Sequence, residues 1–193
     1  LFDLEKLLNI SKNYISKMKA TDLYEKLLQY TKEFDQEFYD LITKYKDYTI
    51  QVLNIEREQK KPRKDYAAYE DIKKQIWYMY DELFFAKEKQ YLYQKITDKQ
   101  EIKKIITLYF EKYYQETDDK DTWFSKVKEL TEELGYASDM KEYKKNPEVY
   151  KGNVADISTV IRVSVTTSNM TPDLYEILRL LGKDRIQKRI SFI

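Results

Sequence analysis

The densest run of basic side chains in the sequence lies between residues 57 and 64. Five of these eight residues are Lys or Arg and a single one is Glu. An Arg side chain offers a planar fork of donors that fits two acceptors on a base edge, whereas Lys acts as a point charge on phosphates. Tyr66 and Tyr69 follow, and aromatic rings stack on unpaired bases. The run indicates either a nucleic-acid contact or, more commonly, a solvated basic turn, and both tyrosines fit a core position equally well.

A second candidate site surrounds Arg162, which stands in a stretch of apolar residues. A lone Arg in such a stretch is most often paired with an acid, and Asp156 or Glu176 would serve. The alternative is a binding role, shared with three residues that follow it: Thr171, Pro172 and Leu174. The residue types leave both interpretations open.

The residue types exclude most catalytic chemistry. The sequence has no Cys and no His, so disulfides, thiol nucleophiles, imidazole bases and the usual zinc sites are excluded. Adjacent carboxylates occur at Asp118–Asp119 and Glu132–Glu133, but neighbours on a helix point to different faces and none has a positioned partner in the sequence. We therefore expect no active site and no cofactor site from this chain's own residues.

Global charge does not identify a partner. Lys and Arg number 35 and Asp and Glu number 34, which gives a formal net charge of +1. This balance favours neither a strong nucleic-acid binder nor a membrane-surface protein, so a partner must be argued from local charge. No apolar run approaches the roughly 20 residues that span a bilayer, and the charged first residues lack a signal-peptide pattern. We expect a cytoplasmic protein without a membrane partner.

Turn-forming residues are scarce, which favours helices. Three Gly and three Pro among 193 residues are too few for an all-β fold, which needs a turn about every 8–12 residues. Apolar residues instead recur every three or four positions. They predict helices over the following ranges: from Thr21 as a cap to Phe34, from Asp35 to Lys61 with Pro62 as the break, from Tyr69 to about Tyr93, from Asp98 to Tyr113, and through Trp123 to Leu134 with Gly135 as the C-terminal cap.

The rest of the chain poses one ambiguity. Residues 137–152 predict short helical turns joined by loops, and residues 158–167 are rich in β-branched side chains that alternate like a strand. A lone strand in a helical chain has no partner, so we predict a helix that begins after Asn153. Two further helices are expected, one that starts at Thr171-Pro172-Asp173 and ends at Gly182, and one over 183–192 with four exposed bases: Lys183, Arg185, Lys188 and Arg189.

Several stretches stand out as motifs when they are taken in order along the chain: Phe2–Leu7, Lys61–Asp65, Ala155–Thr166, Thr171–Leu174 and Leu181–Arg185. Together they resemble the C-terminal part of bacterial glutamyl-tRNA synthetases. The match runs in order over essentially the whole chain, and the block from Arg162 to Arg185 is its most specific piece.

This resemblance implies an all-α fold of two consecutive helical subdomains, described in the family as an anticodon-binding α-helix cage. Residues 1–95 would hold the end of the stem-contact region and the first subdomain, and residues 96–193 the second. The family's class I catalytic domain, which binds ATP, precedes these motifs. One of its adenylate-binding signatures contains His, and Ser16-Lys17-Met18-Lys19 is only superficially like the other. We expect a glutamate–tRNA ligase as the parent protein and no catalytic activity from this chain alone.

The function implied by the resemblance is recognition of a tRNA anticodon, which positions the tRNA for glutamylation by the catalytic domain. The partner is the glutamate tRNA, with the glutamine tRNA as an open alternative, and a monomer is expected. A function of a different class also stays open, namely a helical protein-interaction scaffold that binds no RNA.

The resemblance also assigns roles to single residues. Arg63 corresponds to the Arg that reads the last anticodon base, and Arg162 to the Arg of the apolar helix near the anticodon. The helix start that packs against the splayed bases corresponds to Thr171, Pro172 and Leu174. Contacts to the tRNA backbone are expected from the basic run: Arg57, Lys60, Lys61 and Lys64. One departure is Thr167, where the family usually has Gly, so we expect residues 167–170 to follow a different path.

Overall fold

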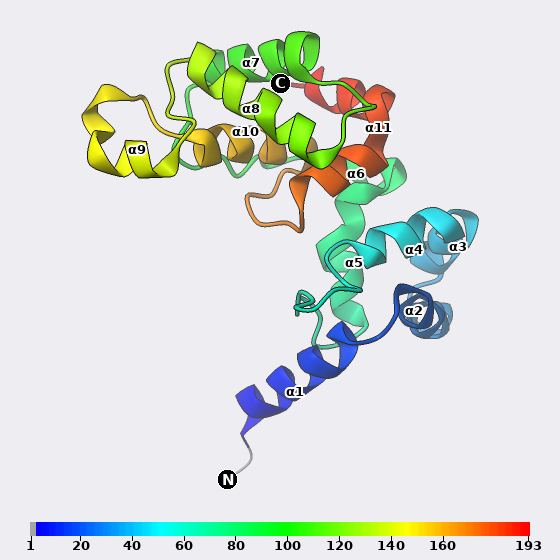
Figure 1. The fold of residues 1–193 in the computed structure, drawn as a ribbon. Coiled ribbons are helices and arrows are strands. Elements are labelled where there is room, and N and C mark those ends of the chain that lie inside the picture. The colour runs from blue at the N-terminus through cyan, green and yellow to red at the C-terminus, as the bar shows by residue number, and fades with distance from the viewer. Residues whose placement is uncertain (1–2) are drawn as a thin grey trace. The chain divides into compact units, whose positions relative to one another are not determined.

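The computed structural model describes residues 3–193, and these residues are helical with connecting loops (Figure 1). Among them there is no strand, and the single β-bridge joins Ala137 to Asn153. The predicted all-α class is confirmed. The chain divides between Ala86 and Lys87 into two compact units, which are described in turn.

The first unit contains six α-helices within the described residues: α1 (Leu4–Ser16), α2 (Ala20–Phe34), α3 (Gln36–Lys44), α4 (Lys46–Asn54), α5 (Glu70–Ile76) and α6 (Asp81–Ala86). Its core is formed where α2 packs on α3 and α4, through fully buried side chains such as Leu23, Leu27 and Phe38. The hydroxyl of Tyr24 donates to the carbonyl of Ile42 at 3.2 Å and ties α2 to α3.

The helix predicted from Asp35 to Lys61 is wrong in its extent. Asp35 caps α3 as expected, because its Oδ1 accepts from the Phe38 amide at 3.0 Å. The helix then breaks at Tyr45, whose hydroxyl bonds to Glu82 at 2.6 Å, and α4 ends at Asn54, well before Pro62. The break at Tyr45 coincides with a bond to a residue distant in the sequence, which periodicity does not reveal.

Two other boundaries in this unit differ from the sequence prediction. Thr21 lies inside α2, which begins after Lys19, and α1 was not predicted because its apolar residues are largely exposed, among them Leu4, Ile10 and Tyr14. The helix expected from Tyr69 to Tyr93 is interrupted by a 3₁₀ turn over Trp77–Met79 and ends at Ala86.

The chain after Ala86 is extended and belongs to the second unit. The Leu92 amide donates to the carbonyl of Thr167 at 3.1 Å, and the Tyr93 hydroxyl bonds to Ser164 at 2.9 Å. These bonds attach the segment 87–97 to the second unit, whereas the sequence placed the boundary near residue 96.

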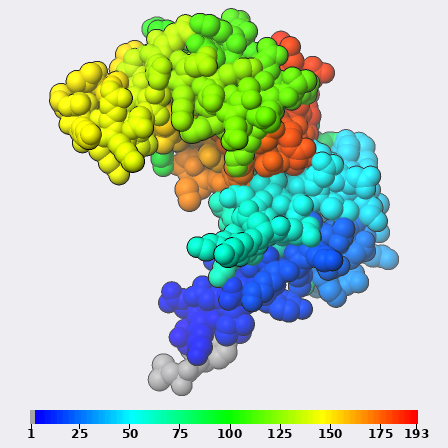
Figure 2. Space-filling model, in the orientation of Figure 1, coloured from blue at the N-terminus to red at the C-terminus, as the bar shows by residue number. Residues whose placement is uncertain are grey.

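The second unit contains α7 (Lys99–Leu108), α8 (Lys120–Glu133), α9 (Met140–Lys145), α10 (Val154–Thr166) and α11 (Leu174–Ile190). Asp98 caps α7, and Gly135 follows α8 with the positive φ of +81° that this C-terminal position favours. Both predictions are confirmed. A π-helical turn over Tyr109–Tyr113 extends α7, and α9 lies in the segment drawn in yellow that projects from this unit (Figure 2).

The ambiguous segment is a helix, as predicted. Asn153 and Asp156 form a reciprocal capping box at the start of α10, and eight of its 13 residues are buried. The wide buried face is rich in β-branched residues, which explains why the sequence also resembles a strand.

The end of the chain brings one confirmation and one correction. Gly182, with φ of +73°, kinks α11 where the sequence predicts a break. The prediction that Arg189 is exposed is wrong, because Arg189 is fully buried and donates from Nη1 to the carbonyl of Val165 at 2.7 Å. Its cation is therefore part of the core beneath α10.

Candidate nucleic-acid interface

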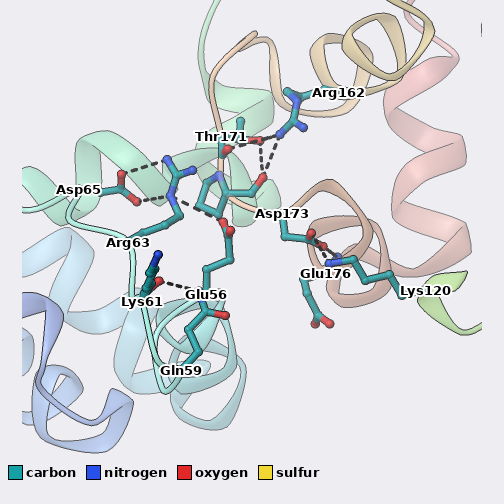
Figure 3. A network of polar contacts seen from close by, with 11 residues as sticks. Glu56, Gln59, Lys61, Arg63, Asp65, Lys120, Arg162, Thr171, Asp173 and Glu176 are labelled. Atoms are coloured by element: carbon teal, nitrogen blue, oxygen red, sulfur yellow. Dashed lines mark hydrogen bonds and ion pairs between the residues drawn. The ribbon is translucent and has the colours of Figure 1, made fainter. Parts of the chain in front are cut away.

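The basic run forms an irregular turn that is closed on itself. After α4 the chain reverses at Glu56, which has a φ of +53°, and the Arg63 amide returns to donate to the Glu56 carbonyl at 3.1 Å. Within the turn, the Gln59 amide side chain donates to the carbonyl of Lys61 at 3.0 Å (Figure 3). Hydrogen bonds within the turn therefore hold its shape. Pro62 lies inside the turn and does not end a helix, contrary to the sequence prediction.

Arg63 is oriented by two carboxylates of the same turn. Its Nε donates to Oδ2 of Asp65 at 2.8 Å and its Nη2 to Oδ1 at 3.0 Å, while Nε lies 3.7 Å from Glu56 (Figure 3). The hydrogen bond to Asp65 raises the pKa of Arg63 above its ordinary value, which keeps the cation fully protonated. A guanidinium has five N–H donors, so the bidentate pair leaves the edge formed by Nη1 and Nη2 for a further planar acceptor.

Arg57 occupies a different environment from the rest of the run. It is 7% exposed, and its Nε donates to the carbonyl of Leu53 at 2.8 Å while its Nη1 donates to Ile15 at 2.7 Å and Met18 at 3.4 Å. Burial lowers its pKa from the ordinary value, although an Arg starts high enough to stay charged. These acceptors are the last carbonyls of α1 and α4, so Arg57 joins the turn to the end of α1.

The two tyrosines after the run also differ from each other. Tyr66 is 7% exposed, and the guanidinium of Arg57 lies 5.8 Å from the centre of its ring. Tyr69 is half-buried, with its ring 6.4 Å from that of Tyr30. Tyr66 is therefore a core residue, and its ring is not presented for stacking on a base.

The three lysines of the run are exposed. Lys60, Lys61 and Lys64 have no carboxylate within salt-bridge distance among the residues that the structure describes. Figure 2 shows the cyan segment that contains the turn at the surface of the first unit. Exposed and uncompensated ammonium groups are the form in which Lys contacts phosphates.

In the second unit, Arg162 holds the loop that precedes α11. Its Nη1 donates to the carbonyls of Thr171 at 3.4 Å and Pro172 at 2.8 Å and bonds to the hydroxyl of Thr171 (Figure 3). These bonds of Arg162 run to the segment that the sequence grouped with it. The side chain of Arg162 is half-buried.

The start of α11 differs in detail from the prediction. Asp173, and not Thr171, is the cap, because its Oδ1 accepts from the Glu176 amide at 3.0 Å while its Oδ2 lies 2.6 Å from Lys120. The Thr171 hydroxyl is engaged by Arg162 and by the Pro172 carbonyl. Leu174 is 4% exposed, so it packs into the core of the unit.

Thr167 adopts a backbone conformation that favours Gly. Its φ is +69° and its ψ is −14°, in the left-handed region where a β-branched residue is strained. Thr167 therefore adopts, with backbone strain, the conformation that a Gly would adopt without it. Next to it the loop leads to Met170, which is 77% exposed.

The paired carboxylates have structural roles. Asp119 caps α8 and Asp118 bonds to Lys126 at 2.7 Å, while Glu133 bonds to Lys112 at 2.6 Å and Glu132 to Ser138. Hydrogen bonds from Thr122 lower the pKa of Asp119, and those from Lys112 and Tyr113 lower the pKa of Glu133. Over residues 3–193 no group of three potential metal ligands is found, and no helix there is long and apolar enough to cross a membrane.

Over the described residues the chain is helical, Arg63 is fixed in an irregular turn, Arg162 on α10 is bonded to the loop before α11, and three lysines are exposed. These features fit a helical nucleic-acid-binding module. Comparison with known proteins identifies which one. The model of the anticodon binding domain family matches residues 22–193, and the chain belongs to this family.

Its relatives are bacterial ligases. The chain is 44% identical over 191 residues to a glutamate–tRNA ligase of Clostridium perfringens and 42% identical over 191 residues to one of Acetivibrio thermocellus. A glutamate–tRNA ligase of Sorangium cellulosum is 33% identical over 193 residues. These alignments cover 98%, 99% and 99% of the chain but 35%, 34% and 33% of the relatives, so the chain spans about a third of their length and matches their C-terminal region.

Sequence reasoning grouped Thr171 and Pro172 with Arg162 but missed the residues that position Arg63 and Arg57. Asp65 stands two residues after Arg63, and this short spacing is the signal that could have found it. Nothing in the sequence pattern marks Glu56, or the carbonyls that hold Arg57 and Arg162, because backbone acceptors carry no residue signature.

Proposed function

We propose that this chain binds the anticodon region of a glutamate tRNA and positions that tRNA for glutamylation by a catalytic domain of the same enzyme. The observation that carries the proposal is the match to an anticodon binding domain over residues 22–193, which includes both Arg63 and Arg162. The names of the relatives supply the amino acid. ATP would be bound and used by the catalytic domain, and this chain would contribute RNA binding alone.

The two arginines have different roles in this proposal. Arg63 presents the Nη1–Nη2 edge of a guanidinium whose orientation is set by Asp65, which suits recognition of a base edge with two acceptors. Arg162 fixes the loop over Thr171 and Pro172, the surface against which unstacked bases would lie. Lys60, Lys61 and Lys64 would contact phosphates, which position the RNA without reading its sequence.

The test is binding of the purified chain to glutamate tRNA and to the same tRNA with an altered last anticodon base, measured over a range of salt concentrations. We expect tighter binding to the natural anticodon and an affinity that falls steeply with salt, because each neutralised phosphate releases counterions. Equal affinity for both tRNAs with a flat salt dependence would favour the protein-interaction scaffold. A second assay, exchange of pyrophosphate into ATP in the presence of glutamate, is expected to stay at background for this chain.

A further inference from the structure

A hollow in the first unit lies between the end of α1 and the basic turn. Its volume is about 890 Å³, within the range of about 300–1,000 Å³ that is usual for ligand sites. Four lysines line it, one at the C-terminal cap of α1 and three from the turn: Lys17, Lys60, Lys61 and Lys64. The sequence analysis assigned no binding role to Lys17, and the family model begins after it, at residue 22.

The charge in this hollow is not compensated from within the unit. Over residues 3–193, none of the four lysines lies within 4.0 Å of a carboxylate, and Glu58 is the one acid in the lining. Other lysines of the same unit do have such partners: Lys44, Lys46, Lys73 and Lys74. Like charges gathered around one hollow repel each other, so an anion bound there relieves an existing cost.

Arg57 explains why the lysines from two segments line one hollow. Its guanidinium donates to the carbonyl of Leu53 at the end of α4 and to the carbonyls of Ile15 and Met18 at the end of α1. These bonds fasten the turn to the segment that carries Lys17. Arg57 is thus a positioning residue of the hollow, and its buried guanidinium is itself committed to protein acceptors.

The lining indicates which part of an RNA fits. No aromatic side chain lies among the described residues that line the hollow, so it offers no platform on which a base would stack. It offers instead four ammonium groups and the exposed amide of Asn13, all of which donate to phosphate oxygens. This composition is typical of contacts to the sugar–phosphate backbone.

We propose that the hollow between α1 and the basic turn is a binding site for the phosphate backbone of the bound tRNA, and that Lys17, the C-terminal cap residue of α1, is one of its phosphate ligands. This inference rests on the proposed function and extends it to a segment that precedes the matched family domain. It separates two tasks within one turn, since Arg63 faces a base edge while the lysines hold the backbone.

The test compares two lysines that are close in sequence, one of which lines the hollow while the other does not. Lys17 lines it, whereas Lys19 is also exposed, has no side-chain bond as the cap of α2 and is absent from the lining. Binding of glutamate tRNA to the chain is measured from low to moderate salt for K17Q, K19Q and the wild type. We expect K17Q to weaken binding several-fold and to reduce the slope of log Kd against log salt by about 1, and K19Q to leave both unchanged.

A second readout locates the contact on the RNA. Ethylation of single tRNA phosphates interferes with binding where the protein touches them. K17Q is expected to remove the interference at one phosphate next to those that K64Q removes. Thermal unfolding of each variant, followed by circular dichroism, checks that the fold is kept.

The possible outcomes separate the two proposals. If the wild type binds no tRNA, the proposed function and this inference both fail. If the wild type binds and K17Q behaves like K19Q, whether both are silent or both are weaker, the hollow is not a backbone site and the proposed function stands.

Discussion

Arg162 holds Thr171 and Pro172 through a single guanidinium nitrogen, Nη1, which bonds to the Thr171 hydroxyl and lies 2.8 Å from the Pro172 carbonyl. The bonds run from the middle of α10 to the loop before α11, so they fix a segment that has no regular secondary structure of its own. A loop that must present a surface to flexible bases needs such an anchor.

We expect the substitution R162Q to loosen this loop. Loss of hydrogen bonds from a charged donor to partly buried acceptors should lower the free energy of unfolding by about 1.5–3 kcal/mol. Because the loop is then less ordered, tRNA affinity should fall as well. Urea unfolding and tRNA titration measure the two effects.

A matched control for this variant is R179Q. Arg179 is on α11 and pairs with Glu176 at 2.8 Å on an exposed surface, so its loss should change the unfolding free energy by no more than about 0.5 kcal/mol. If R162Q and R179Q lose similar unfolding free energy, the bonds of Arg162 to the loop stabilise the protein no more than a surface ion pair does.

Arg63 is expected to discriminate between tRNAs that differ in the last anticodon base. The pairing edge of cytosine, in the glutamate anticodon, presents two acceptors to the Nη1–Nη2 edge of Arg63. The pairing edge of guanine, in the glutamine anticodon, presents two donors that oppose it. R63Q should therefore reduce the preference for glutamate tRNA by about 1–3 kcal/mol. K64Q should weaken binding of both tRNAs alike and flatten the salt dependence. Competition binding with the two tRNAs gives the ratio directly.

Asp65 makes this prediction sharper, because it orients Arg63 without facing the RNA edge. D65N keeps the size of the side chain but weakens the bidentate pair at 2.8 and 3.0 Å. The preference between the two tRNAs should shrink while the salt dependence stays as in the wild type. An unchanged preference in both R63Q and D65N would mean that Arg63 is only a member of a solvated turn.

The helical class and several helix ends were predictable because they depend on local chemistry. Scarce Gly and Pro, the 3.6-residue apolar spacing and the caps Asp35, Asp98 and Asn153 all act within a few residues of each other. Gly135 correctly predicts the end of α8 and Gly182 the break in α11, because each has a positive φ angle that favours Gly.

The surroundings of several polar side chains could not be predicted, because they depend on hydrogen-bond acceptors that the sequence pattern does not identify. Arg57 and Arg189 look like surface cations, yet each is buried where backbone carbonyls accept its donors. Thr171 looks like a helix cap, but its hydroxyl is used by Arg162, and Asp173 takes over the cap. The turn around Arg63 could be recognised by its motif, while its orientation by Asp65 and Glu56 emerges only from the folded loop.

The half-buried Tyr93 and the buried Tyr114 predict how stability depends on pH at high pH. Burial raises the pKa of Tyr93 to about 12 and that of Tyr114 to about 12, above the ordinary value of 10.0. Above pH 10 the unfolded chain loses these protons more readily than the folded one. The stability that these two tyrosines contribute is therefore constant up to about pH 10 and falls between pH 10 and 12. Urea unfolding of Y93F/Y114F should show a shallower fall than the wild type over this range.

The single variants separate the roles of the two hydroxyls at pH 7. The Tyr93 hydroxyl bonds to Ser164 at 2.9 Å, so Y93F should cost about 1 kcal/mol. The Tyr114 hydroxyl is buried and has no hydrogen-bond partner among the described residues, so Y114F should be neutral or slightly stabilising. A marked loss in Y114F would reveal a partner for that hydroxyl, such as a buried water.

Thr167 and its neighbour Thr166 should differ in how much stability each loses when it is replaced by Gly. At Thr167, with φ of +69°, Gly relieves left-handed strain of about 1–2 kcal/mol, which offsets the greater freedom of Gly in the unfolded chain, about 0.4–1 kcal/mol. T167G should therefore leave the unfolding free energy unchanged or raise it by up to about 1.5 kcal/mol. Thr166 ends α10, and its hydroxyl donates to the Arg162 carbonyl at 2.7 Å, so T166G should lose about 2 kcal/mol from helix propensity and the missing bond. Urea unfolding of the two variants decides the matter, since equal losses would show that Thr167 carries no strain for Gly to relieve.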